Sequence, residues 1–403
     1  MKVSVVIVGH VDHGKSTLIG RLLYDSDSIT EGRVEEIQKL AEEYKKRFEF
    51  AYFLDSFDDE LKEERTIDTT GVMFKGEKNL YSITDVPGHK EFIKNMLTGA
   101  SHAEVAVLVV AADEGIQEQT GRHAFLINML DIKKLFVMVN KMDAVDYREE
   151  IFLDIKNKVA KLLTSFGYHD VVFIPGSALE GDNIYKPCER MGWYHGPTLI
   201  EALDSVELPP KEVKPLRFVV QDTYVVDSDK VIVGRVESGV LKKGAEIIFQ
   251  PSGVTGKVEK ITEFQGELEK AEMGDSVGII TSCEPERGDV CALVGDSPTP
   301  TEEFLGEAVL LEKDLRKGDK LELRCGTRRV KCEITEIKEK INSETGEVVE
   351  RHPAEITEND AATIVFATEP LVVEKFSEIP ELGRFILVKD RNIGAGVVLE
   401  AHV

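Results

Sequence analysis

Gly9, Gly14, Lys15 and Ser16 stand at the spacing that a phosphate-binding loop requires. They lie in the sequence GHVDHGKS, which follows an apolar, strand-like run over residues 2–8. The two glycines let the backbone turn tightly enough to aim several N–H groups at anionic oxygens, and the helix that follows adds the positive end of its dipole. Lys15 is then expected on the β- and γ-phosphates and Ser16 on Mg²⁺. The pattern predicts a site for a nucleoside triphosphate.

A second group of polar residues follows the strand-like run 80–84, in the sequence DVPGH. Asp85, at the carboxyl end of a parallel strand, can support the Mg²⁺ shell, and Gly88 can offer its N–H to the γ-phosphate. His89 is the candidate for positioning the attacking water. A threonine of the segment 66–70 could reach the metal ion when a γ-phosphate is present, as a switch segment does. The residue types of that segment fit a solvated loop equally well.

The sequence NKMD, residues 140–143, is the candidate for reading the base. The carboxylate of Asp143 can accept from both the N1–H and the exocyclic amine of guanine, a pair of donors that adenine does not offer. Asn140 would brace the loop, and the aliphatic stem of Lys141 would lie over the purine ring. Backbone N–H groups of the later sequence GSAL, residues 176–179, can meet the guanine carbonyl.

The elements around these motifs predict how the chain is divided. Strand-like runs alternate with helix-like segments to about residue 205, which is typical of a mostly parallel sheet with its ligand at the carboxyl ends of the strands. Short alternating runs with frequent turns then follow two proline-containing linkers, 208–215 and 295–300, and such runs indicate β-barrels. We predict an α/β domain over 1–208 and barrels over 215–296 and 301–403.

Composition excludes several classes of protein. The formal net charge of −24 disfavours non-specific binding to nucleic acid, so no DNA partner is expected, although a local basic patch remains compatible with it. No run approaches the roughly 18 apolar residues of a membrane span, and the chain begins with a strand rather than a leader. The five cysteines lack C-x-x-C spacing, which favours reduced thiols over a zinc site or disulfides. We therefore expect a cytoplasmic protein with no membrane partner.

With GHVDHGKST, DVPGH, NKMD and GSAL in this order, followed by two β domains, the chain resembles the translational GTPase superfamily over essentially its whole length. The resemblance implies an α/β P-loop GTPase domain, with a mostly parallel sheet, followed by two β-barrels, and a site for GTP or GDP with Mg²⁺. It implies that phosphates are bound by Asp12, His13, Gly14, Lys15, Ser16, Thr17 and Gly88. It implies guanine contacts from Asn140, Lys141, Asp143, Ser177, Ala178 and Leu179. Ser16, Thr66 and Asp85 would hold the metal, and His89, Lys15 and Thr66 would serve hydrolysis.

Two branches of the superfamily compete. One is the regulatory GTPase subunit of the two-subunit sulfate adenylyltransferase, which couples GTP hydrolysis to adenylyl-sulfate formation by a partner ATP sulfurylase subunit. The other is elongation factor Tu or one-alpha, whose partners are aminoacyl-tRNA and the ribosome. Stretches similar to the sulfate branch are residues 20–26, 31–32, 50–55, 67–69, 326–327, 358–360 and 383–388, and residues 317–319 replace a Gly-Tyr-x-Pro segment of the tRNA carriers. Stretches similar to elongation factor one-alpha include 215–218 and 221–222, and those shared by both branches include Gly181-Asp182-Asn183 and Trp193-Tyr194. We interpret the chain as the sulfate subunit, with the elongation factor as the alternative.

Two further positions leave alternatives open. Arg65 stands where the family usually has an isoleucine that forms an apolar gate with the valine of the cradle, here Val11. It could act as an arginine finger in cis. We favour the alternative that it pairs with neighbouring glutamates on an exposed loop, an interaction worth about 0 to 1 kcal/mol. His10 and His13 have the H-x-x-H spacing of a metal or adenylyl-transfer site, but their place inside the cradle favours a structural role.

Overall fold

The computed structural model describes residues 2–30, 32, 34–37, 39, 49–53, 71–85, 103–208, 214–226, 229–263 and 266–402. The chain forms two compact units. One comprises Met1–Leu208 with Asn342–Glu347, and the other comprises Pro209–Ile341 with Val348–Val403.

The first unit is built on a six-stranded sheet in the order β2-β3-β1-β4-β5-β6. β2 runs antiparallel to β3, and all other neighbours are parallel. The strands are β1 (Lys2–Gly9), β2 (Gly71–Lys75), β3 (Leu80–Asp85), β4 (Val105–Ala111), β5 (Lys134–Asn140) and β6 (Val172–Pro175). Every residue of β4 is buried, as expected for a parallel strand covered on both faces.

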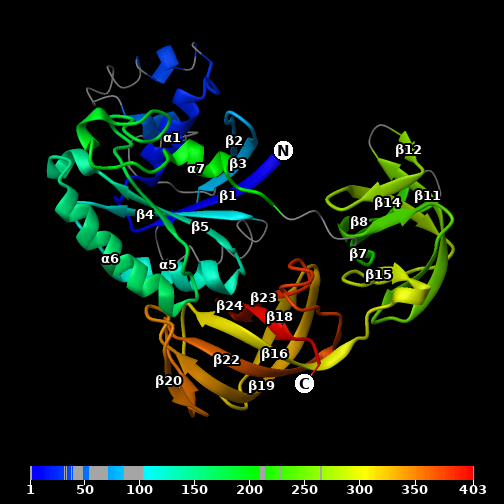
Figure 1. The fold of residues 1–403 in the computed structure, drawn as a ribbon. Helices are drawn as coiled ribbons and strands as arrows, with labels where there is room; N and C mark the ends of the chain where they lie inside the picture. Colours follow the sequence, from blue (N-terminus) through cyan, green and yellow to red (C-terminus); the bar gives the residue numbers. More distant parts are fainter. Residues whose placement is uncertain are drawn as a thin grey trace. The chain divides into compact units, whose positions relative to one another are not determined.

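Helices cover both faces of this sheet. They are α1 (Lys15–Asp25), α5 (Glu118–Met129), α6 (Glu149–Ser165) and α7 (Leu199–Asp204), with the short 3₁₀ helices η1 (Phe50–Phe53), η2 (Met142–Val145) and η3 (Glu189–Met191). Leu22 of α1 and Leu203 of α7 belong to one buried cluster with Val5 and Ile7 of β1, so these two helices share a face. Figure 1 shows α5 and α6 on the opposite face. The edge formed by the carboxyl ends of the strands is left to loops.

The second unit contains two antiparallel seven-stranded sheets, and each of them closes on itself. The first has the order β10-β15-β7-β8-β14-β11-β12 and closes by pairing β10 with β11; the second has the order β18-β23-β24-β16-β22-β19-β20 and closes by pairing β18 with β19. An α/β domain followed by two β-barrels was predicted from the sequence, and this fold class is confirmed. The boundaries 1–208, 215–296 and 301–403 stay a prediction.

The elements of the first barrel are β7 (Arg217–Val226), β8 (Asp229–Ser238), β9 (Val240–Lys242), β10 (Glu246–Gln250), β11 (Val254–Glu263), β12 (Gly266–Leu268), β13 (Lys270–Glu272), β14 (Ser276–Thr281), β15 (Val290–Leu293) and η4 (Val294–Asp296). Those of the second are β16 (Thr301–Leu310), β17 (Leu315–Arg316), β18 (Lys320–Cys325), β19 (Arg328–Ile341), β20 (Val348–Arg351), β21 (Glu355–Ile356), β22 (Ala361–Leu371), β23 (Arg384–Lys389) and β24 (Arg391–Glu400). The largely buried ion pair of Arg217 Nε with Glu374 Oε1, at 2.8 Å, joins the two barrels within this unit.

Candidate nucleotide-binding site

The sheet register brings the predicted motifs to one edge. Ile7 pairs with Asp85, Gly9 with Val109, and Ala111 with Asn140. Because these strands are parallel, their carboxyl ends and the loops that follow them meet at the same edge. The cradle after β1 and the base-reading loops after β5 and β6 therefore lie where a nucleotide binds in sheets of this kind.

The cradle has the backbone shape that its glycine spacing predicts. Asp12 and Gly14 adopt left-handed conformations, with φ of 63° and 84°, and α1 begins at Lys15 directly afterwards. The Lys15 Nζ donates to the carbonyl oxygen of His10 at 2.8 Å, which places the ammonium group against the loop itself. A cation held against a loop at a helix N-terminus suits a polyphosphate.

The His13 side chain is part of the protein interior. It is fully buried, its Nδ1 lies 3.2 Å from the carbonyl oxygen of Val109, and its Nε2 lies 3.6 Å from Glu114 Oε2. Burial lowers the pKa of His13, which keeps the ring neutral. Among the residues that the structure describes, no group of three or more His, Cys, Asp or Glu could hold a metal ion. The contacts of His13 favour a structural role for this member of the H-x-x-H pair.

Asn140 joins the cradle to the loop after β6. Its Nδ2 donates to the carbonyl oxygen of His13 at 2.9 Å, and its Oδ1 accepts from the backbone N–H of Ala178 at 2.9 Å. The side chain is 2% exposed, so both bonds are made in the interior. Each buried amide group is thereby satisfied, and two loops far apart in the sequence are held in fixed relation.

Gly14 is packed against this brace, which gives a testable consequence. A Cβ at position 14 would lie 2.4 Å from Asn140 Nδ2, and a left-handed alanine costs about 1–2 kcal/mol per residue. We expect Gly14→Ala to weaken GDP binding at least about tenfold, since overpacking costs roughly 1–3 kcal/mol and displaces Asn140 from His13.

The matched control is Gly167→Ala. Gly167 has a φ of 82°, and a Cβ added there would meet no heavy atom of the described residues within 4 Å. It incurs the same backbone strain without the clash. GDP titrations and thermal unfolding curves of both variants separate the effect of backbone strain from that of the clash with Asn140. Equal GDP affinities for the two variants would contradict the role given to the contact between Gly14 and Asn140.

Asp143 carries the observation that best fits a guanine ligand. It lies in the first turn of η2, and its Oδ1 is buried without a hydrogen-bond partner among the described residues. Leaving a buried carboxylate oxygen unpaired costs about 1–3 kcal/mol or more, so a ligand with hydrogen-bond donors would relieve that cost. Lys141 Nζ lies 3.7 Å from Asp113 and 3.6 Å from Glu114, which places the lysine across the same edge.

The loop after β6 is held mainly by its own backbone. The N–H of Ser177 donates to the carbonyl oxygen of Asp182 at 3.1 Å, and the N–H of Asp182 donates to that of Ser177 at 3.0 Å. The Ala178 N–H is engaged by Asn140, and the Leu179 carbonyl accepts from Arg21 Nη1 at 3.3 Å. A guanine carbonyl at this loop would share the Ala178 donor or take the next N–H, that of Leu179.

Several residues predicted at the γ-phosphate are not among those that the structure describes. Thr66, Gly88 and His89, together with Arg65, lie outside the described residues. Asp85 ends β3 at the expected edge, but only its backbone is described. Their roles at the γ-phosphate and the metal ion stay predictions.

Sequence reasoning missed two sets of residues at this edge. Asp113 and Glu114 lie near Lys141, and only Ala112 separates them from the end of β4. Their place at a strand's carboxyl end, like that of Asp85 at the end of β3, could have identified them from the sequence. Tyr147 and Asp182 form the second set, joined by a hydrogen bond of 2.8 Å from the tyrosine hydroxyl. Asp182 was noticed only as part of a family motif.

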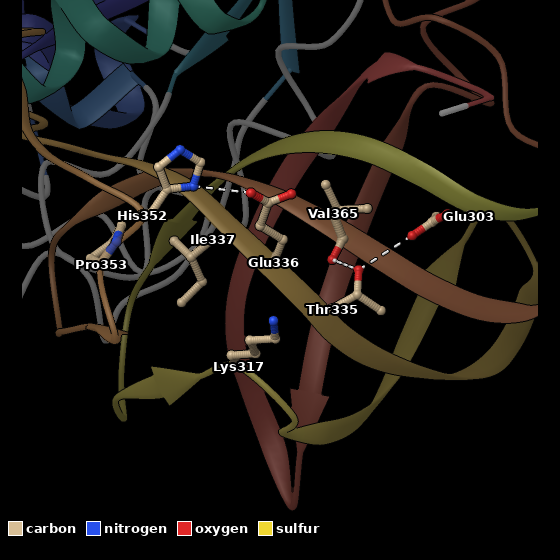
Figure 2. Close-up of a pocket in the computed structure, with 8 residues that line it drawn as sticks. All are labelled: Glu303, Lys317, Thr335, Glu336, Ile337, His352, Pro353 and Val365. Atoms are coloured by element: carbon tan, nitrogen blue, oxygen red, sulfur yellow. Dashed lines mark hydrogen bonds and ion pairs between the residues drawn. The ribbon is translucent and has the colours of Figure 1, made fainter.

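A separate cavity of about 410 Å³ lies in the second barrel (Figure 2). Its lining residues are Glu303, Lys317, Thr335, Glu336, Ile337, His352, Pro353 and Val365. Figure 2 shows His352 paired with Glu336, with the Nδ1 and Oε1 atoms 3.0 Å apart. None of the predicted nucleotide-binding residues that the structure describes lines it. In the described part of the chain, no helix combines the length and apolarity needed to span a membrane.

Comparison with known proteins extends these observations. Three family models match the chain: "Elongation factor Tu GTP binding domain" over residues 2–209, "Elongation factor Tu domain 2" over 229–296, and "GTP-eEF1A C-terminal domain-like" over 307–399. Elongation factor 1-alpha of Methanothrix thermoacetophila is 44% identical over 95% of this chain and 94% of that protein. The protein of the same name from Methanothermobacter thermautotrophicus is 42% identical over 98% and 97%. A crystal structure of sup35 complexed with GMPPNP is 25% identical over 99% of this chain and 94% of that one, with a TM-score of 0.46.

The comparisons correct one prediction. The interpretation as a GTPase subunit of sulfate adenylyltransferase, with an ATP sulfurylase partner, is wrong, because relatives at 40–44% identity over nearly the whole chain are named elongation factor 1-alpha. The stretches that favoured the sulfate branch were short. Identity spread along the full chain outweighs them.

Proposed function

Because the chain belongs to the elongation factor Tu and 1-alpha family of translational GTPases, we propose that it binds aminoacyl-tRNA in its GTP state and delivers it to the ribosome. The observation that carries this proposal is the full-length identity to proteins named elongation factor 1-alpha. Delivery would end with GTP hydrolysis, in keeping with the family.

The residues at the sheet edge support a guanine nucleotide as the ligand. Asp143 would accept from the base, Asn140 would hold the two loops, and Lys15 with the backbone of residues 12–17 would bind the phosphates. Ser16, Thr66 and Asp85 would hold Mg²⁺, which neutralises charge on the β- and γ-phosphates when it is bound. The Asp143 Oδ1 atom, buried with no hydrogen-bond partner in the described part of the chain, is the feature of this structure that fits such a ligand best.

A switch between two states is what makes such a site useful to a carrier. A segment that reaches the metal ion only when a γ-phosphate is present lets hydrolysis change the shape that a partner recognises. The net charge of −24 repels polyanions in general. Any contact with tRNA must therefore come from a local basic surface, because the overall electrostatic field of the protein repels the phosphates.

Protection of the aminoacyl ester tests the proposal. Spontaneous deacylation of Phe-tRNA is followed with the full chain in excess, loaded with GDP or with a non-hydrolysable GTP analogue. We expect the analogue-bound protein to slow deacylation and the GDP-bound protein to leave it nearly unchanged. Uncharged tRNA added as competitor is expected to displace little Phe-tRNA. Equal deacylation rates in the two nucleotide states would refute nucleotide-dependent binding of aminoacyl-tRNA.

A further inference from the structure

The two base-reading loops are tied to each other by a side-chain contact at their far ends. Tyr147 closes the loop that carries Lys141 and Asp143, and Asp182 closes the loop that carries Ser177 and Ala178. The Tyr147 hydroxyl donates to Asp182 Oδ2 at 2.8 Å. This bond spans 35 residues of sequence and joins the two segments that would hold a purine between them.

The Asp182 carboxylate is the centre of a small cluster. Its side chain is 14% exposed, and Arg190 Nη2 donates to the same oxygen at 2.6 Å. The Arg190 guanidinium carbon also lies 4.3 Å from the centroid of the Tyr147 ring, a cation–π contact. Charge-assisted bonds of this length are stronger than neutral ones, so the carboxylate is firmly placed.

Tyr147 is also held from its backbone. Its carbonyl oxygen accepts from Trp193 Nε1 at 3.1 Å, and its N–H donates to the carbonyl oxygen of Met142 at 2.9 Å. The residue has a φ of 55°, a conformation that costs a non-glycine residue about 1–2 kcal/mol. Strain of this kind persists only where the surroundings determine it, and here it aims the side chain at Asp182.

The contacts continue directly to the base-reading groups. Asp182 pairs with Ser177 through both backbone bonds, which ties its backbone to the residue directly before Ala178. On the other loop, the N–H of Asp146 donates to the carbonyl oxygen of Asp143. Burial raises the pKa of Tyr147, so the hydroxyl keeps its proton and stays a donor.

We propose that Tyr147, Asp182 and Arg190 form a clamp that holds the Asp143 loop and the Ser177–Ala178 loop at the spacing guanine requires, and that this clamp slows the release of guanine nucleotides. The three are positioning residues. The inference rests on the proposed function, because it assumes that the chain binds GTP and GDP.

Tyr147→Phe removes only the hydroxyl and tests the clamp. GDP release from the full chain is expected to become about tenfold faster, the effect of losing one hydrogen bond to a charged group. Affinity for inorganic pyrophosphate, which would use the cradle alone, is expected to stay unchanged. Asp182→Asn should also speed release, since it weakens the bonds from both Tyr147 and Arg190. Adding Tyr147→Phe to Asp182→Asn should speed release little further, because the bond that Tyr147 makes to Asp182 is then already weakened.

Tyr168→Phe is the matched control. Its hydroxyl donates to the carbonyl oxygen of Ile132 at 2.7 Å, away from both base-reading loops, and burial raises its pKa as it does for Tyr147. We expect this variant to lose stability without faster GDP release. Equal release rates for the two tyrosine variants, or a parallel loss of pyrophosphate affinity in Tyr147→Phe, would overturn the clamp. A wild-type chain that binds pyrophosphate but no guanine nucleotide would overturn the proposed function as well.

Discussion

Asp143→Asn is expected to weaken GTP binding by roughly 3–6 kcal/mol, because hydrogen bonds to a charged group contribute about 1.5–3 kcal/mol each and guanine offers two donors to this carboxylate. The amide replaces one acceptor with a donor. Xanthosine triphosphate, which carries a carbonyl where guanine has its amine, is then expected to bind the variant more tightly than GTP does.

Calorimetric titration of both nucleotides against the wild-type chain and the variant measures this exchange of specificity. Asp146→Asn is the matched control, because Asp146 lies in the same loop, is exposed, and has a left-handed backbone that asparagine tolerates. We expect it to leave both affinities nearly unchanged. An Asp143→Asn variant that binds GTP as tightly as the wild type would remove Asp143 from base recognition.

His89→Ala is expected to slow GTP hydrolysis by about 10² to 10⁴, the usual contribution of a group that positions or activates a reactant. The expectation comes from the sequence, where His89 follows Gly88, the residue predicted to contact the γ-phosphate. Nucleotide affinity should change little, since the histidine acts on the attacking water rather than on the bound ligand.

Single-turnover hydrolysis of pre-bound GTP, with and without ribosomes, separates this step from binding and release. His169→Ala, which removes an exposed histidine far along the chain, controls for general effects of the substitution. Unchanged single-turnover rates in His89→Ala would exclude the residue from the hydrolytic step.

The parallel sheet could be predicted because its buried strands appear in the sequence as continuous apolar runs. β4, Val105–Ala111, is apolar at every position and buried at every position. The barrels were harder to delimit. β11, Val254–Glu263, carries charged residues on its outer face, buries only two of its ten residues, and changes register between Val258 and Lys260. Such a strand shows neither alternating apolar and polar residues nor a high apolar content. Its place in the barrel is determined by pairing with the neighbouring strands, which the sequence of the strand alone does not show.

The site residues stay a prediction, which rests on the residue types that backbone chemistry dictates. A loop that cradled phosphate would need a glycine such as Gly14, and a loop that read guanine would need a carboxylate such as Asp143. The partners of Asn140 could not be predicted, since they lie 127 and 38 residues away and come together only in the folded sheet. The bond between Tyr147 and Asp182 was out of reach for the same reason.

The wrong choice between two branches of one superfamily has a related cause. The motifs at the sheet edge are those predicted to bind GTP, a ligand expected in both branches, so they do not distinguish a protein partner from aminoacyl-tRNA. The difference between the branches must therefore come from residues outside these motifs, and single short stretches such as 383–388 are a small sample of those residues. Sequence identity measured over nearly the whole chain includes those residues as well.

Delivery of Phe-tRNA to poly(U)-programmed ribosomes of the source organism tests the central claim most directly. The measured quantities are Phe-tRNA bound to the ribosome and GTP hydrolysed, with the wild-type chain and with Asp143→Asn. We predict that the wild type places Phe-tRNA with stoichiometric hydrolysis of GTP, and that the variant does so with xanthosine triphosphate but not with GTP. Phe-tRNA placement that does not depend on the nucleotide, or no placement by a chain that binds and hydrolyses GTP, would contradict the account.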